Sequence, residues 1–342
     1  MKLLKYSQIK LSKGGSSMAR ILFLAQFAPN MDGVLLQSPK NAEEEYYAEM
    51  YHLKIFEVLK RYNYDFFSTH DVRHLLEHSS NYDLVWSLYN RIGFRNSEVF
   101  VQSLCEYFKL KYIGAAPNIR ALVEDKSISK QLAEHIGIKT AKWVVASPRY
   151  KLLKTPPFPG PYFVKPRFGS ASIGIDESSL CNDWDNALLK ANSYHNDDLE
   201  IIVEQFIDGI NYGVPVMNTH GDNPLIAIPR YTISQSIGGV MTYSQKRRAT
   251  GGMSSHTSND EHLNKMLMYL AKQYYMEIQP CDYARIDFLV DKKSGTPYFL
   301  EVNTLMNLSV QGGFIKSFLH NEFNSYDEII RHIVELGVSK LK

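Results

Sequence analysis

Cysteine is scarce in this chain of 342 residues, and long apolar runs are missing. The three cysteines have neither metal-ligand nor redox spacing, which predicts unpaired thiols in a reducing compartment. No stretch approaches the roughly 18 consecutive apolar residues that a membrane-spanning helix needs. Residues 1–17 are basic and polar and lack the apolar core of a signal peptide. We therefore expect a cytoplasmic protein with no membrane partner and a flexible extension at residues 1–17.

A strong charge of either sign is also missing. Lys and Arg number 38 against 36 for Asp and Glu, which gives a formal net charge of +2. So small an excess provides no field that would attract nucleic acid. We expect small-molecule partners and no nucleic acid. The length suits an enzyme of two or three domains or lobes.

Apolar strands alternate with helical patterns in the first half of the chain, which predicts an α/β protein. A helix is expected from Glu43 to Leu59, and another through Ile128 and Leu132 that ends at Gly137. Strands are expected in "ARILFLAQFAP", "YDLVWSLY", "KLKYIG", "AKWVVAS", "PYFVKP" and "LEIIVEQFIDG".

The second half begins with further strands over residues 210–233. Residues 234–260 are rich in Gly, Ser and Thr and predict a long loop, of the kind that often forms a lid. Helical periodicity follows over residues 263–274. Near the end, Ser325 and Glu328 form the pattern of a capping box that starts a last helix.

The segment "YARIDFLVDKKSGTPYFLEVN", residues 283–303, predicts a β-hairpin with "KKSGT" as its loop. A symmetric register pairs Asp287 with Glu301 and Arg285 with Asn303. Strict alternation also puts Phe299 on the face of Glu301 and Asn303.

Two carboxylates in a direct cross-strand pair repel each other unless a positive charge lies between them. The oxygen ligands of Asp287, Glu301 and Asn303 suit Mg²⁺, which binds one or two carboxylates together with substrate phosphates. The alternative is a solvent-facing hairpin in which Asp287 and Arg285 make an ordinary surface pair.

Lysines and a run of small residues predict a phosphate site. Lys165 ends the apolar strand "YFVK", and burying its charge is costly without an anion. The run from Gly169 to Gly174 lets the backbone approach a ligand, although it lacks the ending of a P-loop. Ordinary alternatives are a snorkelling Lys165, a flexible turn, a solvated Lys126 at a helix start and a Lys246 that only keeps its loop soluble.

Taken in order, five segments resemble the ATP-grasp superfamily, and most closely its D-alanine–D-alanine ligase-like branch. They are "EDKSISKQLAEHIGIKT", "FVKPRFGSASIGI", "IIVEQFIDG", "YARIDFLVD" and "FLEVN", and the resemblance covers most of residues 114–310. It implies an α/β ATP-grasp fold with an N-terminal α/β domain and two α+β lobes that hold ATP between them. The expected limits are 18–117 for the first domain, 118–207 for the central lobe and 208–342 for the C-terminal lobe.

The resemblance also implies a role for each matching residue. Lys126 and Lys165 would contact the ATP phosphates, and the flap over them would contain Gly169, Ser170, Ala171 and Ser172. The adenine hinge would be Glu204, Gln205, Phe206 and Ile207, with Asn211 at the ribose. Asp287, Glu301 and Asn303 would hold Mg²⁺, or Mn²⁺ in its place. Arg285 would stabilise the acyl phosphate, with Tyr243 and Lys246 in the loop above the site.

The implied reaction activates a substrate carboxylate with ATP and passes it to an amine, releasing ADP and phosphate. The implied partners are amino-acid-like carboxylate and amine substrates and a second copy of the chain in a homodimer. Departures from the family pattern cluster at the substrate ends, where the expected Ser-Pro-Gly-Met-Thr becomes "TLMNLSVQGGF". Substrate-side candidates are Asn90, Arg91, Arg95, Asn307, Gln311 and residues 252–256, although ordinary surface or core packing would also explain each of them.

Three functions therefore stay open from the sequence. The first is a carboxylate–amine ligase with substrates of its own, which the changed substrate motifs favour. The second is a D-alanine–D-alanine ligase of cell-wall synthesis with a diverged first domain. The third is an ATP-binding sensor or scaffold without turnover. Such a protein has less need of a complete set of metal ligands on one face of the hairpin.

Overall fold

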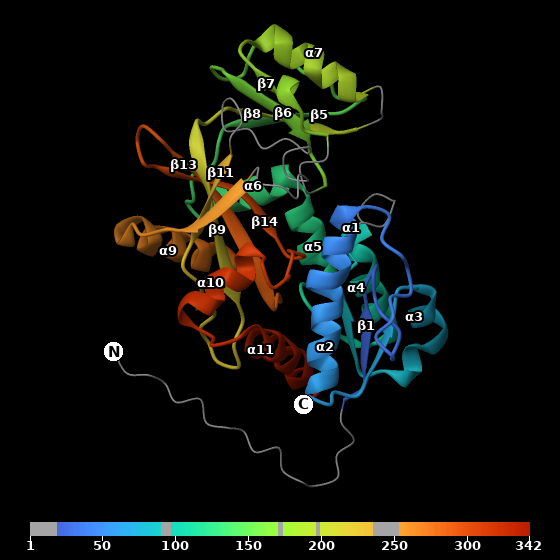
Figure 1. Cartoon of the computed structure of the whole chain (residues 1–342). Coiled ribbons are helices and arrows are strands. Elements are labelled where there is room, and N and C mark those ends of the chain that lie inside the picture. Colours follow the sequence, from blue (N-terminus) through green and yellow to red (C-terminus); the bar gives the residue numbers. More distant parts are fainter. Residues whose placement is uncertain (1–18, 90–96, 170–173, 196–198, 235–252) are drawn as a thin grey trace.

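The computed structural model describes residues 19–89, 97–169, 174–195, 199–234 and 253–342, and these form three β-sheets with helices packed around them (Figure 1). Tyr243, Lys246, Ser170, Ala171 and Ser172 lie outside the described residues. No described helix has both the length and the apolar character needed to cross a membrane.

The first sheet is parallel, with the strand order β2-β1-β3-β4. Its strands are β1 (Ile21–Leu24), β2 (Phe66–Thr69), β3 (Leu84–Ser87) and β4 (Lys111–Ile113). Its helices are α1 (Ala42–Tyr47), a π-helical turn (Ala48–His52), α2 (Leu53–Arg61), α3 (Arg73–His78), a 3₁₀ turn (Ser79–Asn81) and α4 (Ser97–Phe108). The predicted strands and the helix from Glu43 are confirmed. β2 was not predicted, because a four-residue strand ending in Ser and Thr gives no apolar alternation.

The second sheet is antiparallel, with the order β5-β8-β6-β7. Its strands are β5 (Trp143–Ala146), β6 (Tyr162–Pro166), β7 (Leu180–Cys181) and β8 (Ile201–Gln205). A 3₁₀ turn (Glu177–Ser179) precedes β7, and α7 (Trp184–His195) packs its apolar side chains on the sheet (Figure 1). The strands predicted from "AKWVVAS", "PYFVKP" and "LEIIVEQFIDG" are confirmed.

The third sheet is also antiparallel, with the order β12-β11-β9-β13-β14. Its strands are β9 (Gly209–Met217), β10 (Leu225–Ile226, paired with β9), β11 (Arg230–Ser234), β12 (Met253–Thr257), β13 (Tyr283–Asp291) and β14 (Pro297–Asn303). The prediction of one loop over 234–260 is wrong at 253–257, where β12 pairs with β11. Its sequence "MSSHT" is too polar to show a strand pattern.

One face of the third sheet is apolar and covered by helices. Ala284, Ile286 and Phe288 of β13 join a buried cluster with α5 (Pro117–Glu124), α6 (Lys126–His135) and α9 (Glu261–Glu277). Gly137, at φ +79°, follows the end of α6 as predicted. Because side chains alternate along a strand, the opposite face is left to Arg285 and Asp287. The limits of the predicted lobes stay a prediction.

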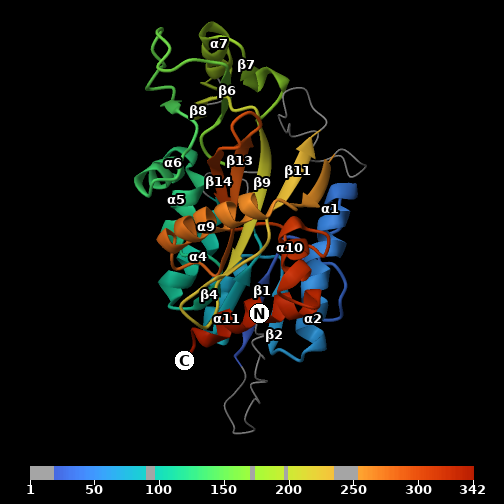
Figure 2. The ribbon, with the colours of Figure 1, turned by 90° about the vertical axis from the view of Figure 1, so that its left-hand side faces the viewer.

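The C-terminal helices return to the first sheet. α10 (Gly313–Asn321) and α11 (Tyr326–Ser339) share a buried cluster with β1, β3 and α2, and Figure 2 shows them on that side of the molecule. Ser325 accepts a hydrogen bond from the Glu328 N–H, as expected for the start of α11. The N-terminal domain and the C-terminal end of the chain therefore share one core.

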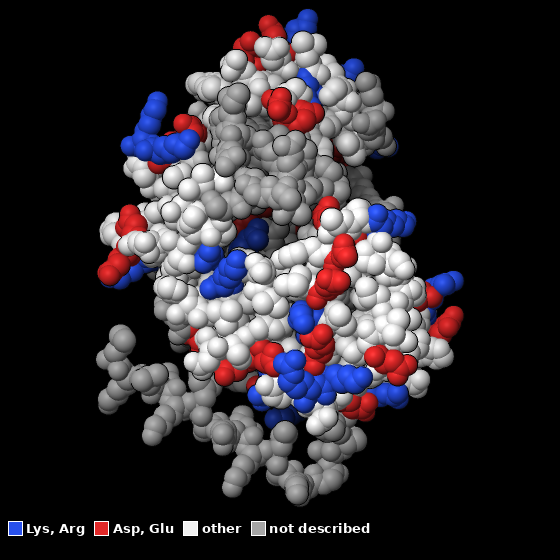
Figure 3. All heavy atoms as spheres, viewed as in Figure 1, with Lys and Arg blue, Asp and Glu red and all other residues white. Residues whose placement is uncertain are grey.

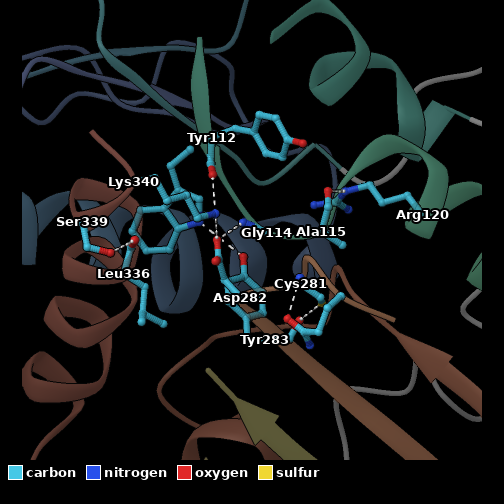
Figure 4. Close-up of polar contacts among 12 residues, drawn as sticks. Tyr112, Gly114, Ala115, Arg120, Cys281, Asp282, Tyr283, Leu336, Ser339 and Lys340 are labelled. Carbon is cyan, nitrogen blue, oxygen red and sulfur yellow. Dashed lines mark hydrogen bonds and ion pairs between the residues drawn. The ribbon is translucent and has the colours of Figure 1, made fainter. Parts of the chain in front are cut away.

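A polar clasp closes the same junction (Figure 4). The buried Asp282, just before β13, accepts hydrogen bonds of 2.7 Å from the Gly114 N–H and 2.7 Å from Lys340 Nζ. Lys340 also donates to the Tyr112 carbonyl at 2.9 Å. One carboxylate thus joins β4, β13 and the end of α11.

Replacing this carboxylate should destabilise the whole protein. We expect Asp282→Ala to lower the free energy of unfolding by about 2–3 kcal/mol, because it leaves a buried N–H and an ammonium group without their anion. Chemical denaturation followed by circular dichroism measures the loss. The control is Asp65→Ala, which removes an exposed pair with Arg20 at 3.8 Å and should cost less than about 1 kcal/mol. Equal losses for the two variants would contradict the role of the clasp.

Candidate active site

Four polar side chains meet on the open face of β13 and β14. As predicted, Asp287 pairs with Glu301 and Arg285 pairs with Asn303. Arg285 donates from Nε and Nη2 to the two oxygens of Asp287, at 2.7 and 2.6 Å. The Asn303 amide nitrogen lies 3.2 Å from Asp287 Oδ2 and 3.4 Å from Glu301 Oε1. Asp287 is 3% exposed. The alternative of an ordinary surface pair between Asp287 and Arg285 on a solvent-facing hairpin is therefore wrong.

A β-bulge shifts the register beyond this group. The pairing moves from Asp287 with Glu301 to Phe288 with Phe299, which leaves Leu300 as an extra residue. Phe299 therefore turns into the core, where it is 1% exposed and stacks on Tyr274 at 4.5 Å. The expectation that Phe299 shares a face with Glu301 is wrong, because simple alternation does not allow for the extra residue.

The charge of Arg285 is stabilised where it lies. Burial works against the guanidinium charge, but Asp287 and Glu301 outweigh that cost, and the pKa of Arg285 is raised. Arg285 thus supplies the positive charge that two adjacent carboxylates require. Gly213 of β9 makes room for it, since a Cβ there would lie 3.0 Å from Arg285 Cδ and 3.2 Å from Asp287 Oδ1.

A second charged group lies in the central lobe. Lys165, 4% exposed, places Nζ 2.7 Å from Glu204 Oε2, and Lys130 Nζ lies 3.0 Å from Glu204 Oε1. Burial raises the pKa of Glu204, but the two lysines outweigh it and lower that pKa to about 2. The anion that the burial of Lys165 requires is Glu204, so snorkelling of Lys165 to the surface is wrong. Sequence reasoning missed Lys130, although its i, i+4 spacing from Lys126 places both on one side of α6.

Lys126 begins α6 and reaches the small-residue run. Its Nζ donates to the Gly169 carbonyl at 2.6 Å. Part of the side chain reaches solvent, yet burial lowers the pKa of Lys126 from 10.5 to about 8. Asp125 caps α6 and binds Arg167 through both oxygens, at 2.9 and 2.6 Å. The helix start is thereby fixed to the segment that leads to Gly169.

One pocket lies between Lys126 at the start of α6 and the Glu301 and Asn303 side chains of β14. Its lining comprises Glu98, Val123, Glu124, Lys126, Gly169, Glu301, Val302, Asn303, Thr304 and Leu305. Figure 3 shows basic and acidic side chains together in a hollow on this side of the molecule. Lys126 begins α6 and Gly169 follows β6, whereas Glu301 and Asn303 belong to β14. Glu98 and Glu124 were not predicted as site residues, because a single Glu on a helix is usually an ordinary surface residue.

The predicted hinge follows β8. The N–H of Gln205 binds the Lys142 carbonyl and that of Phe206 binds the Pro161 carbonyl, each at 2.8 Å. Among the described residues, no backbone carbonyl accepts from the Ile207 N–H. Asn211 pairs with Leu289 of β13, which places it on the open face of the sheet with Asp287.

The segment after β14 is held by tyrosines from other elements. Tyr46 hydrogen-bonds Ser309 Oγ at 2.9 Å, and Tyr51 donates to the Met306 carbonyl at 3.2 Å. Asn307 Oδ1 accepts from the Ser309 N–H at 2.7 Å, which fixes the local turn. The N-terminal domain therefore determines the shape of residues 304–312.

Comparison with known proteins decides the family. The family model named D-ala D-ala ligase C-terminus matches residues 130–335, which is more than half of the chain. The chain belongs to the D-alanine–D-alanine ligase family. As a member of this family it is an ATP-dependent ligase that forms C–N bonds.

Relatives and solved structures agree with this assignment to the ligase family. D-alanine–D-alanine ligase B of Clostridium perfringens is 28% identical over 244 residues, covering 70% of this chain and 76% of that protein. The D-alanine–D-alanine ligase of Aquifex aeolicus is 28% identical over 213 residues, covering 61% and 68%.

The ATP-grasp fold predicted from the sequence is confirmed by solved structures. The Bacillus anthracis D-alanine–D-alanine ligase complexed with ATP superimposes with a TM-score of 0.71 at 18% identity, over 94% of this chain and 98% of that chain. The D-alanyl-alanine synthetase A of Vibrio cholerae gives a TM-score of 0.70 at 18% identity, over 95% and 100%.

Filling the space above Gly213 should disturb the ligase reaction. We expect Gly213→Ala to lower kcat about 100-fold, because the added methyl displaces Arg285 from Asp287 and misplaced catalytic groups cost rates of this size. Steady-state kinetics with ATP and amino acids measures it. Gly221→Ala is the control, since its nearest atom would be Thr219 Oγ1 at 3.7 Å. Unchanged kcat in Gly213→Ala would show that the position of Arg285 does not matter.

Proposed function

We propose that this ligase activates a substrate carboxylate with ATP as an acyl phosphate and transfers it to the amine of a second, amino-acid-like substrate. The observation that carries the proposal is the single pocket lined by Lys126 and Gly169 on one side and by Glu301 and Asn303 on the other. Phosphoryl transfer depends mainly on positioning and on stabilising negative charge. An ammonium group on one side and oxygen ligands on the other are groups that this chemistry needs.

ATP would bind with its phosphates at Lys126 and Lys165. Support comes from the cluster of Lys130, Glu204 and Lys165, which places two ammonium groups against one carboxylate and so favours a further anion nearby. The adenine would lie at the hinge, where Ile207 offers an N–H, and the ribose at Asn211. Ser170, Ala171 and Ser172 would cover the phosphates together with Gly169.

Mg²⁺ fits the donor set of the hairpin. Asp287 and Glu301 supply two carboxylates and Asn303 an amide oxygen, and Mg²⁺ usually adds phosphate oxygens and water to such a set. Among the described residues, no three His, Cys, Asp or Glu side chains surround one point, so these ligands would be completed by the nucleotide. When bound, Mg²⁺ or Mn²⁺ would neutralise phosphate charge.

Arg285 would stabilise the negative charge that develops at the substrate carbonyl. Its Nε and Nη2 are fixed on Asp287, and no described residue accepts a hydrogen bond from Nη1. A donor held in place before the reaction costs no reorganisation during it. Tyr243 and Lys246 keep the roles that the family resemblance implies, and a homodimer stays a prediction.

D-alanine for both substrates is the second candidate. The names of the Clostridium perfringens and Aquifex aeolicus relatives favour it. Residues 304–312 argue against it. They follow β14, which carries the proposed metal ligands, and their sequence differs from the family pattern. D- and L-amino acids therefore both belong in the test.

The test measures phosphate release from ATP and Mg²⁺ with D- and L-amino acids, singly and in pairs, with products identified by mass spectrometry. We expect a pair-dependent signal and a product lighter than its parts by one water. Asp287→Asn should reduce turnover at least about 100-fold, because it removes a charge at the phosphate site. Asp71→Asn, at a surface pair with Arg73, should not. Tight ATP binding without turnover on any pair would instead indicate a sensor.

The affinity for ATP should depend on pH through Lys126. With its pKa lowered to about 8, Lys126 is charged at pH 7 and loses its charge as the pH rises through that value. We expect ATP to bind about tenfold more weakly once the ammonium is neutral, since hydrogen bonds to charged groups are worth more than neutral ones. Bound phosphate raises the pKa of Lys126, so the fall appears somewhat above pH 8. Calorimetric titration of ATP from pH 6.5 to 9.5 measures the effect.

The matched variant is Lys126→Arg, whose guanidinium stays charged over that whole range. Its ATP affinity should not fall with rising pH. A parallel fall in wild type and variant would assign the pH dependence to another group.

A further inference from the structure

A row of paired residues crosses the third sheet from the proposed metal ligands to Arg230. Glu301 pairs with Asp287, Asp287 with Gly213, Gly213 with Arg230, and Arg230 with Thr257. Side chains of directly opposed residues in antiparallel strands lie on the same face. Arg230 therefore shares the open face with Asp287 and Glu301. Two strand spacings separate its Cα from that of Asp287, which is about 10 Å.

The guanidinium of Arg230 is held by neutral acceptors on β12. Its Nε donates to Ser255 Oγ at 3.0 Å, Nη2 to the Ser255 carbonyl at 2.5 Å, and Nη1 to Thr257 Oγ1 at 2.6 Å. A guanidinium has five N–H donors. Within the described segments two donors are left, one on each terminal nitrogen, and such a fork matches the two oxygens of a carboxylate.

The charge of Arg230 has no acidic partner within the part of the chain that the structure describes. Among the described residues, Arg230 forms no ion pair with Asp or Glu, whereas Arg285 and Arg167 both do. Residues 235–252, which connect β11 to β12, contain no Asp or Glu at all. Burial lowers the pKa of Arg230, so the group has lost water without gaining an anion. A cation in this condition favours an anionic ligand.

The position of Arg230 indicates which part of the reaction it faces. Its partner Ser255 lies beside Gly313, where a Cβ would be 4.0 Å from Ser255 Oγ. Gly313 follows the segment 304–312, whose sequence departs from the family. Along the row, Glu301 lies at the pocket with Lys126. Arg230 lies on the other side of Gly213, and the Arg285 side chain lies over Gly213, where a Cβ would be 3.0 Å from Arg285 Cδ.

We propose that Arg230 binds the carboxylate of the amine substrate and selects amino acids over simple amines. This rests on the proposed function. The carboxylate of the other substrate is consumed when it is activated beside Asp287, so a carboxylate beyond Arg285 belongs to the attacking amine. Arg230 is then a specificity-determining residue, and Ser255 and Thr257 position it.

The test is a competition between two amines. The enzyme is given ATP, Mg²⁺ and equal concentrations of D-alanine and D-alaninamide, and mass spectrometry measures the ratio of the dipeptide to the dipeptide amide. If the amino-acid panel identifies another amine substrate, that acid and its amide replace this pair. Wild type should favour the acid, and Arg230→Met should reduce this preference about 10- to 100-fold, as expected for hydrogen bonds to a charged group. Arg230→Lys should restore part of the preference.

Controls separate recognition from structure. KM for ATP should be the same in wild type and Arg230→Met, and Arg73→Met, which removes an exposed surface arginine, should leave the product ratio unchanged. An unchanged product ratio in Arg230→Met would overturn the proposal. So would an equal loss of both products together with a raised KM for ATP, which would make Arg230 only a strap between β11 and β12.

Failure of the proposed function gives a different result. If wild type turns over no amino acid, the proposed reaction is wrong. The role of Arg230 is then tested by amino-acid binding alone. D-alanine is added to the enzyme with bound ADP and Mg²⁺, and the resulting shift in the Tm of the enzyme is measured. A shift in wild type that Arg230→Met lacks would support the carboxylate site. No shift in wild type, or the same shift in both proteins, would overturn it.

Discussion

The antiparallel pairing of β13 with β9 and β14 determines where the charged groups of the active site lie. β13 contributes Arg285 and Asp287, β14 contributes Glu301 and Asn303, and backbone hydrogen bonds bring them opposite one another. A slip of one residue in such a ladder would turn every one of these side chains into the apolar core. The core itself prevents the slip, because Ile286 and Phe288 are fully buried on the other face. Hydrophobic packing on one side of the sheet thus fixes electrostatics on the other.

The charged group on the sheet is built around two carboxylates, and the one in the central lobe around two ammonium groups. On the sheet, the Arg285 guanidinium binds both oxygens of Asp287 and lies near Glu301. In the central lobe, Lys130 and Lys165 leave Glu204 with one positive charge in excess. A nucleotide with a divalent cation carries both kinds of charge. For the proposed nucleotide and cation, fixed charges of this kind would stabilise a transition state without reorganisation.

The sequence predicted the parts of this arrangement that depend on local periodicity. The pairing of Asp287 with Glu301 was predicted from alternation and a symmetric loop, although next to the loop Val290 pairs with Pro297, one residue off that register. The bulge at Leu300 could not be predicted, since nothing in "PYFLEVN" marks an unpaired residue. Lys165 could be predicted to need an anion, but its partner Glu204 is close only in the folded sheet. Lys130 was missed because the apolar stripe at Ile128 and Leu132 drew the prediction to the opposite side of α6, where Ile128 is in fact 38% exposed.

The proposed substrate end is hardest to predict, because its residues come from many elements. Tyr46 and Tyr51 of the first domain hold residues 304–312, and β12 holds Arg230. None of these contacts is local in sequence, and β12 itself is too polar to be predicted as a strand. Metal and phosphate ligands can be compared with a family one residue at a time, because each acts through its own charge. Substrate recognition depends instead on how distant segments are positioned against each other, and a sheet position such as Arg230 is fixed by the same ladder that fixes Asp287.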